Sequence, residues 1–150
     1  MLYSISLYFV LQKMHNLLIY VLSLPTKIKM LKKMDAIAVA NYFIKKQKQV
    51  KSEHELTVLR LIKLVYIAYG FALSLLDRCI INPRFDKVEA WKLGPVIPSV
   101  YHTFKYNGIG EVKDEGGFLR TKEDGYSMFL YTPAVDKNDT ELIAVLDLIW

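Results

Sequence analysis

The stretch from Leu56 to Leu76 constrains the fold most, because it is long, strongly apolar and interrupted by a single glycine. Its apolar residues recur at i, i+3, i+4 and i+7, which is the spacing of one face of an α-helix. Further apolar residues fill much of the remaining circumference, so we expect this helix to be mostly buried. Thr57 or Ser52 can cap its start, and Asp77 can end it.

Three other stretches also show helical patterns. One begins at Asp35, a suitable N-cap, and ends in a run of lysines that suits the negative end of the helix dipole. A second follows Gly94-Pro95, where the dipeptide predicts a turn and Pro95 takes the first helical position. A third covers residues 139–150.

Short strands are predicted near residues 88–92, 118–121 and 126–131, which together would form a small antiparallel sheet. The length of 150 residues fits one domain. The pattern therefore predicts a mainly α fold of the α+β class: a compact helical domain around a buried central helix, with a small antiparallel sheet.

Composition divides the chain at Met34, into an apolar and basic extension at 1–33 and a domain at 34–150. Residues 2–24 are apolar and long enough to span a bilayer, but Lys13 lies at the centre, where a charge costs about 2.5–3.5 kcal/mol. The segment is either a marginal membrane helix or upstream of the working start of translation. The abrupt change at Met34 favours the second interpretation.

The net charge of +5 comes entirely from the extension, because residues 34–150 carry equal numbers of basic and acidic side chains. A nucleic-acid partner is therefore not indicated, and contact with a membrane could arise only through residues 2–24. The single cysteine, Cys79, excludes a disulfide scaffold and fits a reducing compartment. We expect a cytoplasmic protein.

No catalytic cluster, metal site or cofactor motif stands out. The histidines at 15, 54 and 102 lack the spacing of metal ligands, and Cys79 with His102 is not a recognisable nucleophile pair. Asp77, Asp86 and Glu89 could line a metal-dependent nuclease site, but a helix end and a solvated loop explain them better. We predict a protein that is not an enzyme. A metal-dependent hydrolase or nuclease, and a membrane-anchored protein, stay open as alternatives.

Two motifs carry more information, one within 61–70 and the other within 89–101. Lys63 lies on an apolar helix face and must find a partner for its ammonium group, with Glu89 as a candidate. Trp91 and Tyr101 are amphipathic rings that favour half-buried positions.

Together, the two motifs resemble the Panacea antitoxin domain, a SocA-like family found in phage-associated proteins. The resemblance covers about residues 35–150, with Arg60 in place of the family's first lysine; residues 1–33 have no counterpart, and the family usually continues past a helix like 139–150. The matching positions are Leu61, Lys63, Leu64, Tyr66, Glu89, Ala90, Trp91, Gly94, Pro95, Val96, Pro98 and Tyr101.

The resemblance implies the antitoxin half of a toxin–antitoxin module, which neutralises a protein toxin by binding it directly. The cognate toxin is expected to be encoded nearby, and an ATP-dependent protease is a further expected partner if the antitoxin acts as an adaptor. No catalytic residue, metal or cofactor is implied. The expected partner-binding residues are Lys63, Tyr66, Glu89, Trp91, Gly94, Pro95, Val96, Pro98 and Tyr101.

Overall fold

The computed structural model describes residues 35–50, 55–82 and 86–150. Both interpretations of residues 1–33, and the suggested cap at Ser52, lie outside the described residues. The described elements are helices α2 (Ala36–Gln49), α3 (Val58–Leu76), α4 (Pro98–Phe104) and α5 (Thr140–Ile149), the 3-10 turn η1 (Lys105–Asn107), and strands β1 (Glu89–Trp91), β2 (Gly94–Val96), β3 (Phe118–Thr121) and β4 (Met128–Tyr131). The predicted α+β class is confirmed.

Helix ends follow the local signals in the sequence. The Asp35 carboxylate accepts a hydrogen bond from the Ile37 N–H at 2.9 Å, so it caps α2 as predicted. The Thr57 hydroxyl oxygen accepts from the Arg60 N–H at 3.4 Å at the start of α3. Asp77 takes a left-handed conformation, with φ of 50°, and ends α3. These three ends were readable because each depends on residues within one turn.

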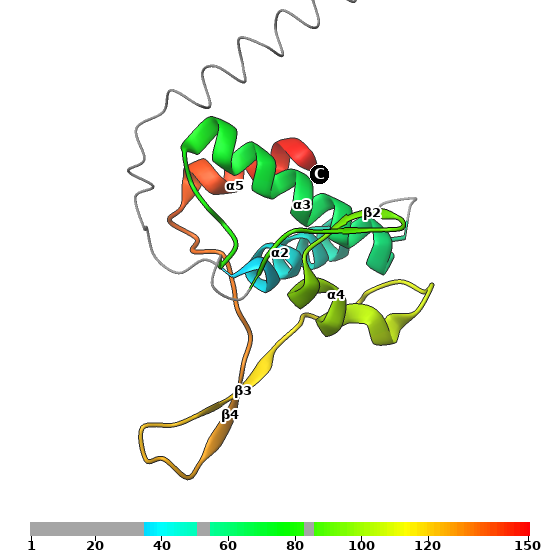
Figure 1. The fold of residues 1–150 in the computed structure, drawn as a ribbon. Helices are drawn as coiled ribbons and strands as arrows, with labels where there is room; N and C mark the ends of the chain where they lie inside the picture. The colour runs from blue at the N-terminus through cyan, green and yellow to red at the C-terminus, as the bar shows by residue number, and fades with distance from the viewer. Residues whose placement is uncertain (1–34, 51–54, 83–85) are drawn as a thin grey trace, which may run out of the picture.

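The core forms where α3 packs against α2 on one side and α5 on another (Figure 1). Helix α4 also contacts α2 and α3. Each large apolar side chain that is fully buried in this core contributes about 1.5–3 kcal/mol to the free energy of folding, relative to an exposed one. The largest fully buried side chains are Phe43, Ile44, Leu56, Leu61, Ile80, Ile97, Leu142, Leu146, Val39, Val65, Val100 and Val112.

Helix α3 is central, but the prediction that it is mostly buried is wrong. One side supplies core residues, while the opposite side leaves a stripe of apolar side chains exposed. By length and composition α3 could also cross a membrane, although helices from protein cores meet the same criteria. The periodicity could not separate the two faces, because apolar residues occupy both. The exposed stripe contains Leu59, Tyr66, Ile67, Phe71 and Leu75.

The strands form two separate hairpins rather than one sheet. Strand β1 pairs antiparallel with β2, and β3 with β4. The prediction of a turn at Gly94-Pro95 is wrong, since both residues lie in β2, with Gly94 opposite Trp91 and Pro95 opposite Ala90. The following helix begins at Pro98, which takes the N-terminal position assigned to Pro95.

An ion pair ties the start of α5 to the chain segment that follows α3. The Arg78 guanidinium donates to both carboxylate oxygens of Asp139, and the Nη1–Oδ1 distance is 2.7 Å. Asp139 also accepts from the Leu142 N–H at 3.3 Å and so caps α5. Both side chains are mostly buried. The hydrogen bonds from Arg78 hold the pKa of Asp139 below its usual value.

Candidate partner-binding site

The site starts with the ammonium group of Lys63, which reaches from α3 to the β1–β2 hairpin. Lys63 Nζ donates to the Pro95 carbonyl oxygen at 2.9 Å. Glu89, the partner suggested by the sequence, does not hold it. The lysine needed a hydrogen-bond acceptor rather than a countercharge, and a strand carbonyl provides one.

Gly94 makes this approach sterically possible. Its φ of +100° strongly favours glycine, and a Cβ at this position would lie 3.0 Å from Lys63 Nζ. Glycine at 94 therefore serves both the backbone of the hairpin and the space needed by the lysine. The Gly-Pro pair thus forms part of strand β2, which packs against α3.

Trp91 is fixed at the rim of the same hairpin by two contacts. Its Nε1 donates to a carboxylate oxygen of Glu89 at 2.7 Å. Its ring meets Tyr101 of α4 edge to face, with 4.8 Å between ring centroids. The ring nevertheless stays 37% exposed. Trp91 is thus a surface aromatic held in one orientation, as interface anchors commonly are.

The nine residues named from the sequence divide into two groups. Val96 is buried and Pro98 starts α4, so both support the fold. The hairpin, Tyr101 and Lys63 come together through the contacts above, and Tyr66 is exposed one turn further along α3. The structure therefore brings the two sequence motifs onto neighbouring elements.

Sequence analysis missed Asn41, which holds the base of the β3–β4 hairpin. Its side chain is fully buried in α2. Asn41 Nδ2 donates to the carbonyl oxygens of Gly116 and Pro133, both at 2.8 Å, and Oδ1 accepts from the Gly116 N–H at 2.7 Å. The available signal was a lone amide on an otherwise apolar helix face, although the partners could not be read from it.

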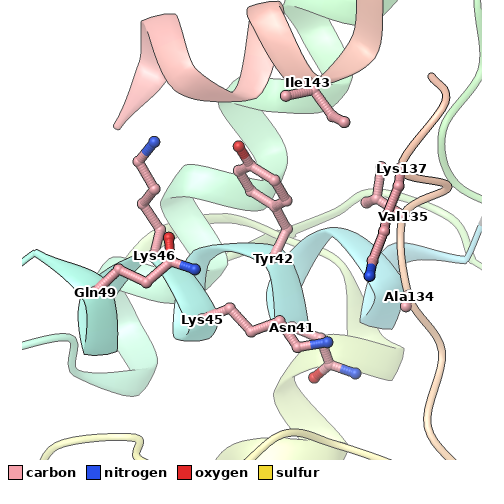
Figure 2. A pocket seen from close by; sticks show the side chains of 9 residues that line it. All are labelled: Asn41, Tyr42, Lys45, Lys46, Gln49, Ala134, Val135, Lys137 and Ile143. Carbon is pink, nitrogen blue, oxygen red and sulfur yellow. The ribbon is translucent and has the colours of Figure 1, made fainter. Parts of the chain in front are cut away.

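A pocket of about 260 Å³ opens between α2 and residues 134–137. Figure 2 shows Tyr42 and Lys46 pointing from α2 towards α5 beside this pocket, where both bind the Asp147 carboxylate at 2.6 Å. Burial, followed by the contact with Asp147, raises the pKa of Tyr42 to about 12. Lys45 pairs with Glu115 at 3.0 Å. Two of the three lysines that line the pocket, Lys45 and Lys46, thus have carboxylate partners.

The described ranges contain no group of three histidine, cysteine or acidic residues that could hold a metal ion. Of the acids considered for a nuclease site, Asp77 ends α3 and Glu89 accepts from Trp91. The Cys79 thiol donates to the Ile81 carbonyl oxygen at 3.2 Å, while His102 packs against Tyr101. These contacts account for Asp77, Glu89, Cys79 and His102 without assigning them chemistry. The expectation of a solvated loop is wrong for Asp86, which is 4% exposed.

A protein-family model described as Antitoxin SocA-like, Panacea domain, matches residues 61–144, which is more than half of the chain. The chain belongs to this SocA-like Panacea family. The resemblance predicted from the motifs is therefore confirmed. The matched range includes Lys63, the β1–β2 hairpin and Tyr101, as well as the whole β3–β4 hairpin, whereas Asn41 precedes it.

Antitoxin SocA of Caulobacter vibrioides (strain NA1000 / CB15N) is 42% identical to the chain over 74 residues. The aligned part is 49% of this chain and 37% of that protein, so the chain spans well under half the length of this curated Panacea relative. No solved structure matches the chain. Membership of the SocA-like Panacea family supports an antitoxin role.

Proposed function

We propose that this protein is the antitoxin of a toxin–antitoxin module and neutralises a protein toxin in the cytoplasm by binding it directly. The observation that carries the proposal is Trp91, an exposed ring locked by Glu89 and Tyr101 in the motif that defines the family resemblance. A pre-positioned aromatic side chain loses little conformational entropy on binding, which favours affinity. No reaction is involved, so no catalytic residue is required.

The proposed binding face extends from the β1–β2 hairpin onto α3. Leu93 at the hairpin turn is 69% exposed, and the stripe on α3 includes Tyr66 and Ile67. Contiguous apolar surface on a folded domain commonly marks a site of protein association. Lys63 and Gly94 hold the hairpin against α3, so both parts of the face keep a fixed relative position.

The test is co-expression of the full chain with the protein encoded by the neighbouring gene, scored by growth and by co-purification. Leu93→Glu places a charge on the proposed face, at a side chain whose exposure makes a folding defect small. Ile109→Glu is the matched control, because Ile109 is 98% exposed and lies outside this face. We expect Leu93→Glu to lose neutralisation and Ile109→Glu to retain it.

Trp91→Ala and Tyr101→Ala remove the aromatic anchors themselves. Truncation of an interface hot spot costs about 2 kcal/mol or more, which is roughly a thirtyfold loss of affinity. Circular dichroism must show that each variant is folded. If folded variants bind and rescue as well as the wild type, the face is misplaced; if the wild type itself fails to bind the neighbouring product, the proposed function is rejected for that pair.

Neutralisation by blocking and neutralisation by delivery to an ATP-dependent protease predict different toxin lifetimes. Blocking leaves the toxin intact in a stable complex. Delivery shortens its half-life and requires the protease. A pulse-chase measurement of the toxin, with and without the antitoxin and in cells with and without the protease, separates these two modes.

A further inference from the structure

The β3–β4 hairpin projects away from the helices as an arm (Figure 1). Three of its side chains, Leu119, Met128 and Leu130, are 67%, 65% and 67% exposed. The arm is not loosely attached, because Asn41 holds the chain just before β3 and just after β4. A two-stranded hairpin is only marginally stable in water by itself, so an anchored one with an apolar surface requires an explanation.

The alternation of hydrogen-bonded and non-bonded residue pairs along the hairpin shows which backbone groups face outward. The Lys122 N–H donates to the Ser127 carbonyl oxygen at 2.7 Å, which makes these two residues a hydrogen-bonded pair. Such pairs alternate with non-bonded pairs along antiparallel strands. In the observed register, Met128 and Leu130 therefore occupy non-bonded positions. Their backbone N–H and C=O groups point away from β3, towards the free edge of β4.

The two faces of the hairpin differ. On one face, the Arg120 guanidinium carbon lies 3.9 Å from the centroid of the Tyr131 ring, and Phe118 packs edge to face on Tyr131. The side chains on that face therefore pack against one another within the hairpin. The other face carries Leu119 opposite Leu130, next to Met128, and all three are exposed.

The two edges also differ in charge. Strand β3 contains Arg120 and is followed by Lys122, whereas β4 reads Met-Phe-Leu-Tyr, with neither charge nor proline. Native proteins usually protect free edges with charges, prolines or bulges, because an unprotected edge pairs with other strands. The edge of β4 lacks the first two of these protections.

We propose that the β4 edge pairs antiparallel with β4 of a second copy of this chain, forming a four-stranded sheet in the order β3-β4-β4-β3. A twofold axis at Phe129 places Met128 opposite Leu130 of the second copy, so that the outward backbone groups of both copies bond to each other. Like charges do not meet across this edge. Pairing through β3 would instead place the Arg120 side chains of the two copies near each other, which disfavours it.

Two proline variants test the proposal in the full chain by sedimentation velocity over a range of concentrations. Leu130→Pro removes an outward N–H from the β4 edge, and Leu119→Pro removes one from the β3 edge. These residues are cross-strand partners with equal exposure, so their effects on the hairpin itself are matched. We expect the wild type and Leu119→Pro to dimerise, and Leu130→Pro to dimerise about tenfold or more weakly, because hydrogen bonds are lost on both sides of the axis.

A disulfide measurement gives an independent readout. In the proposed register Phe129 lies opposite itself at a non-bonded position, where the Cα atoms of an antiparallel pair are about 4.5 Å apart and within reach of a disulfide. In a Cys79→Ser background, Phe129→Cys should cross-link two copies readily, and Leu119→Cys should not. A chain that stays monomeric at all concentrations, or a dimer that survives Leu130→Pro, overturns the proposal. If the wild type is itself monomeric and Leu130→Pro loses toxin binding, the edge pairs with a foreign strand and the proposal is overturned.

Discussion

The Asn41 side chain and the Gly116 backbone exchange two hydrogen bonds across 75 residues of sequence. The amide of Asn41 thereby replaces the water that Gly116 would otherwise bind, and a third bond to Pro133 brings the other leg of the β3–β4 hairpin to the same point. One buried side chain thus determines where the arm leaves the helical body.

Replacing Asn41 with alanine should destabilise the domain by about 3 kcal/mol, because three buried backbone groups lose their partners together. Urea unfolding gives the loss in free energy. Asn107→Ala is the control, since Asn107 is exposed and its amide bonds locally to the Phe104 carbonyl oxygen. A comparable loss in both variants would show that the buried hydrogen bonds of Asn41 stabilise the fold no more than an exposed local one.

Comparing Gly94→Ala with Gly125→Ala separates two costs in stability: the strain of a positive φ in alanine, and the close contact of a new Cβ with Lys63. Both glycines have positive φ, +100° and +76°, but only the Cβ at 94 would meet another atom, Lys63 Nζ at 3.0 Å. Gly125→Ala should cost about 1–2 kcal/mol from strain alone. Gly94→Ala should cost about 1 kcal/mol more, because the bond from Lys63 to Pro95 is disturbed as well.

A double-mutant cycle checks the origin of that difference. In a Lys63→Met background the ammonium group is absent, so Gly94→Ala should cost no more than Gly125→Ala. Thermal unfolding of the four combinations provides the values. If the excess cost persists without the ammonium group, the collision with Lys63 is not its cause.

Arg78→Ala should reduce stability by about 1–3 kcal/mol at neutral pH and also flatten the acid limb of the stability curve. The pKa of Asp139 is lowered in the folded state by Arg78, so the stabilisation is present above the ordinary aspartate pKa of about 4 and is lost as pH falls through the lowered value. The wild type and the variant should converge once the pH has fallen below this lowered pKa, where Asp139 is protonated in both proteins. Parallel curves across this range would assign the loss to packing instead.

Substitutions on the two faces of helix α3 should affect stability very differently. Leu75→Gln changes a side chain that is 59% exposed and should alter stability by less than about 0.5 kcal/mol. Leu61→Ala removes a fully buried side chain and should cost about 2–5 kcal/mol. Denaturant titrations of both variants measure this contrast. A large loss in Leu75→Gln would mean that the exposed stripe packs against another part of the chain.

The sequence predicted those parts of the fold that depend on neighbouring residues. Asp35 and Thr57 cap their helices through bonds that reach only two or three residues ahead. The Panacea motifs were equally legible, because their order and spacing lie within a short stretch. A helix-length apolar run also located α3 correctly at the centre of the packing.

The remaining features depend on residues far apart in the chain. Gly94-Pro95 has the local signature of a turn before a helix, yet Lys63, 32 residues earlier than Pro95, helps to hold the dipeptide in a strand. The exposed face of α3 also carries several large apolar side chains, so the pattern of apolar residues did not reveal which face is buried. Asn41 gave no indication of partners on the far side of the fold.

The reach of Asn41 also sets an order of events on the ribosome. Its second acceptor, Pro133, is synthesised 92 residues later, which corresponds to about 5–20 s at ordinary rates of translation. During that interval, α2 and α3 can emerge and associate, but the amide of Asn41 still depends on water. The nascent chain therefore cannot satisfy this buried amide until synthesis has passed the β3–β4 hairpin, so the segments on both sides of the hairpin must be made before the interior around α2 is complete.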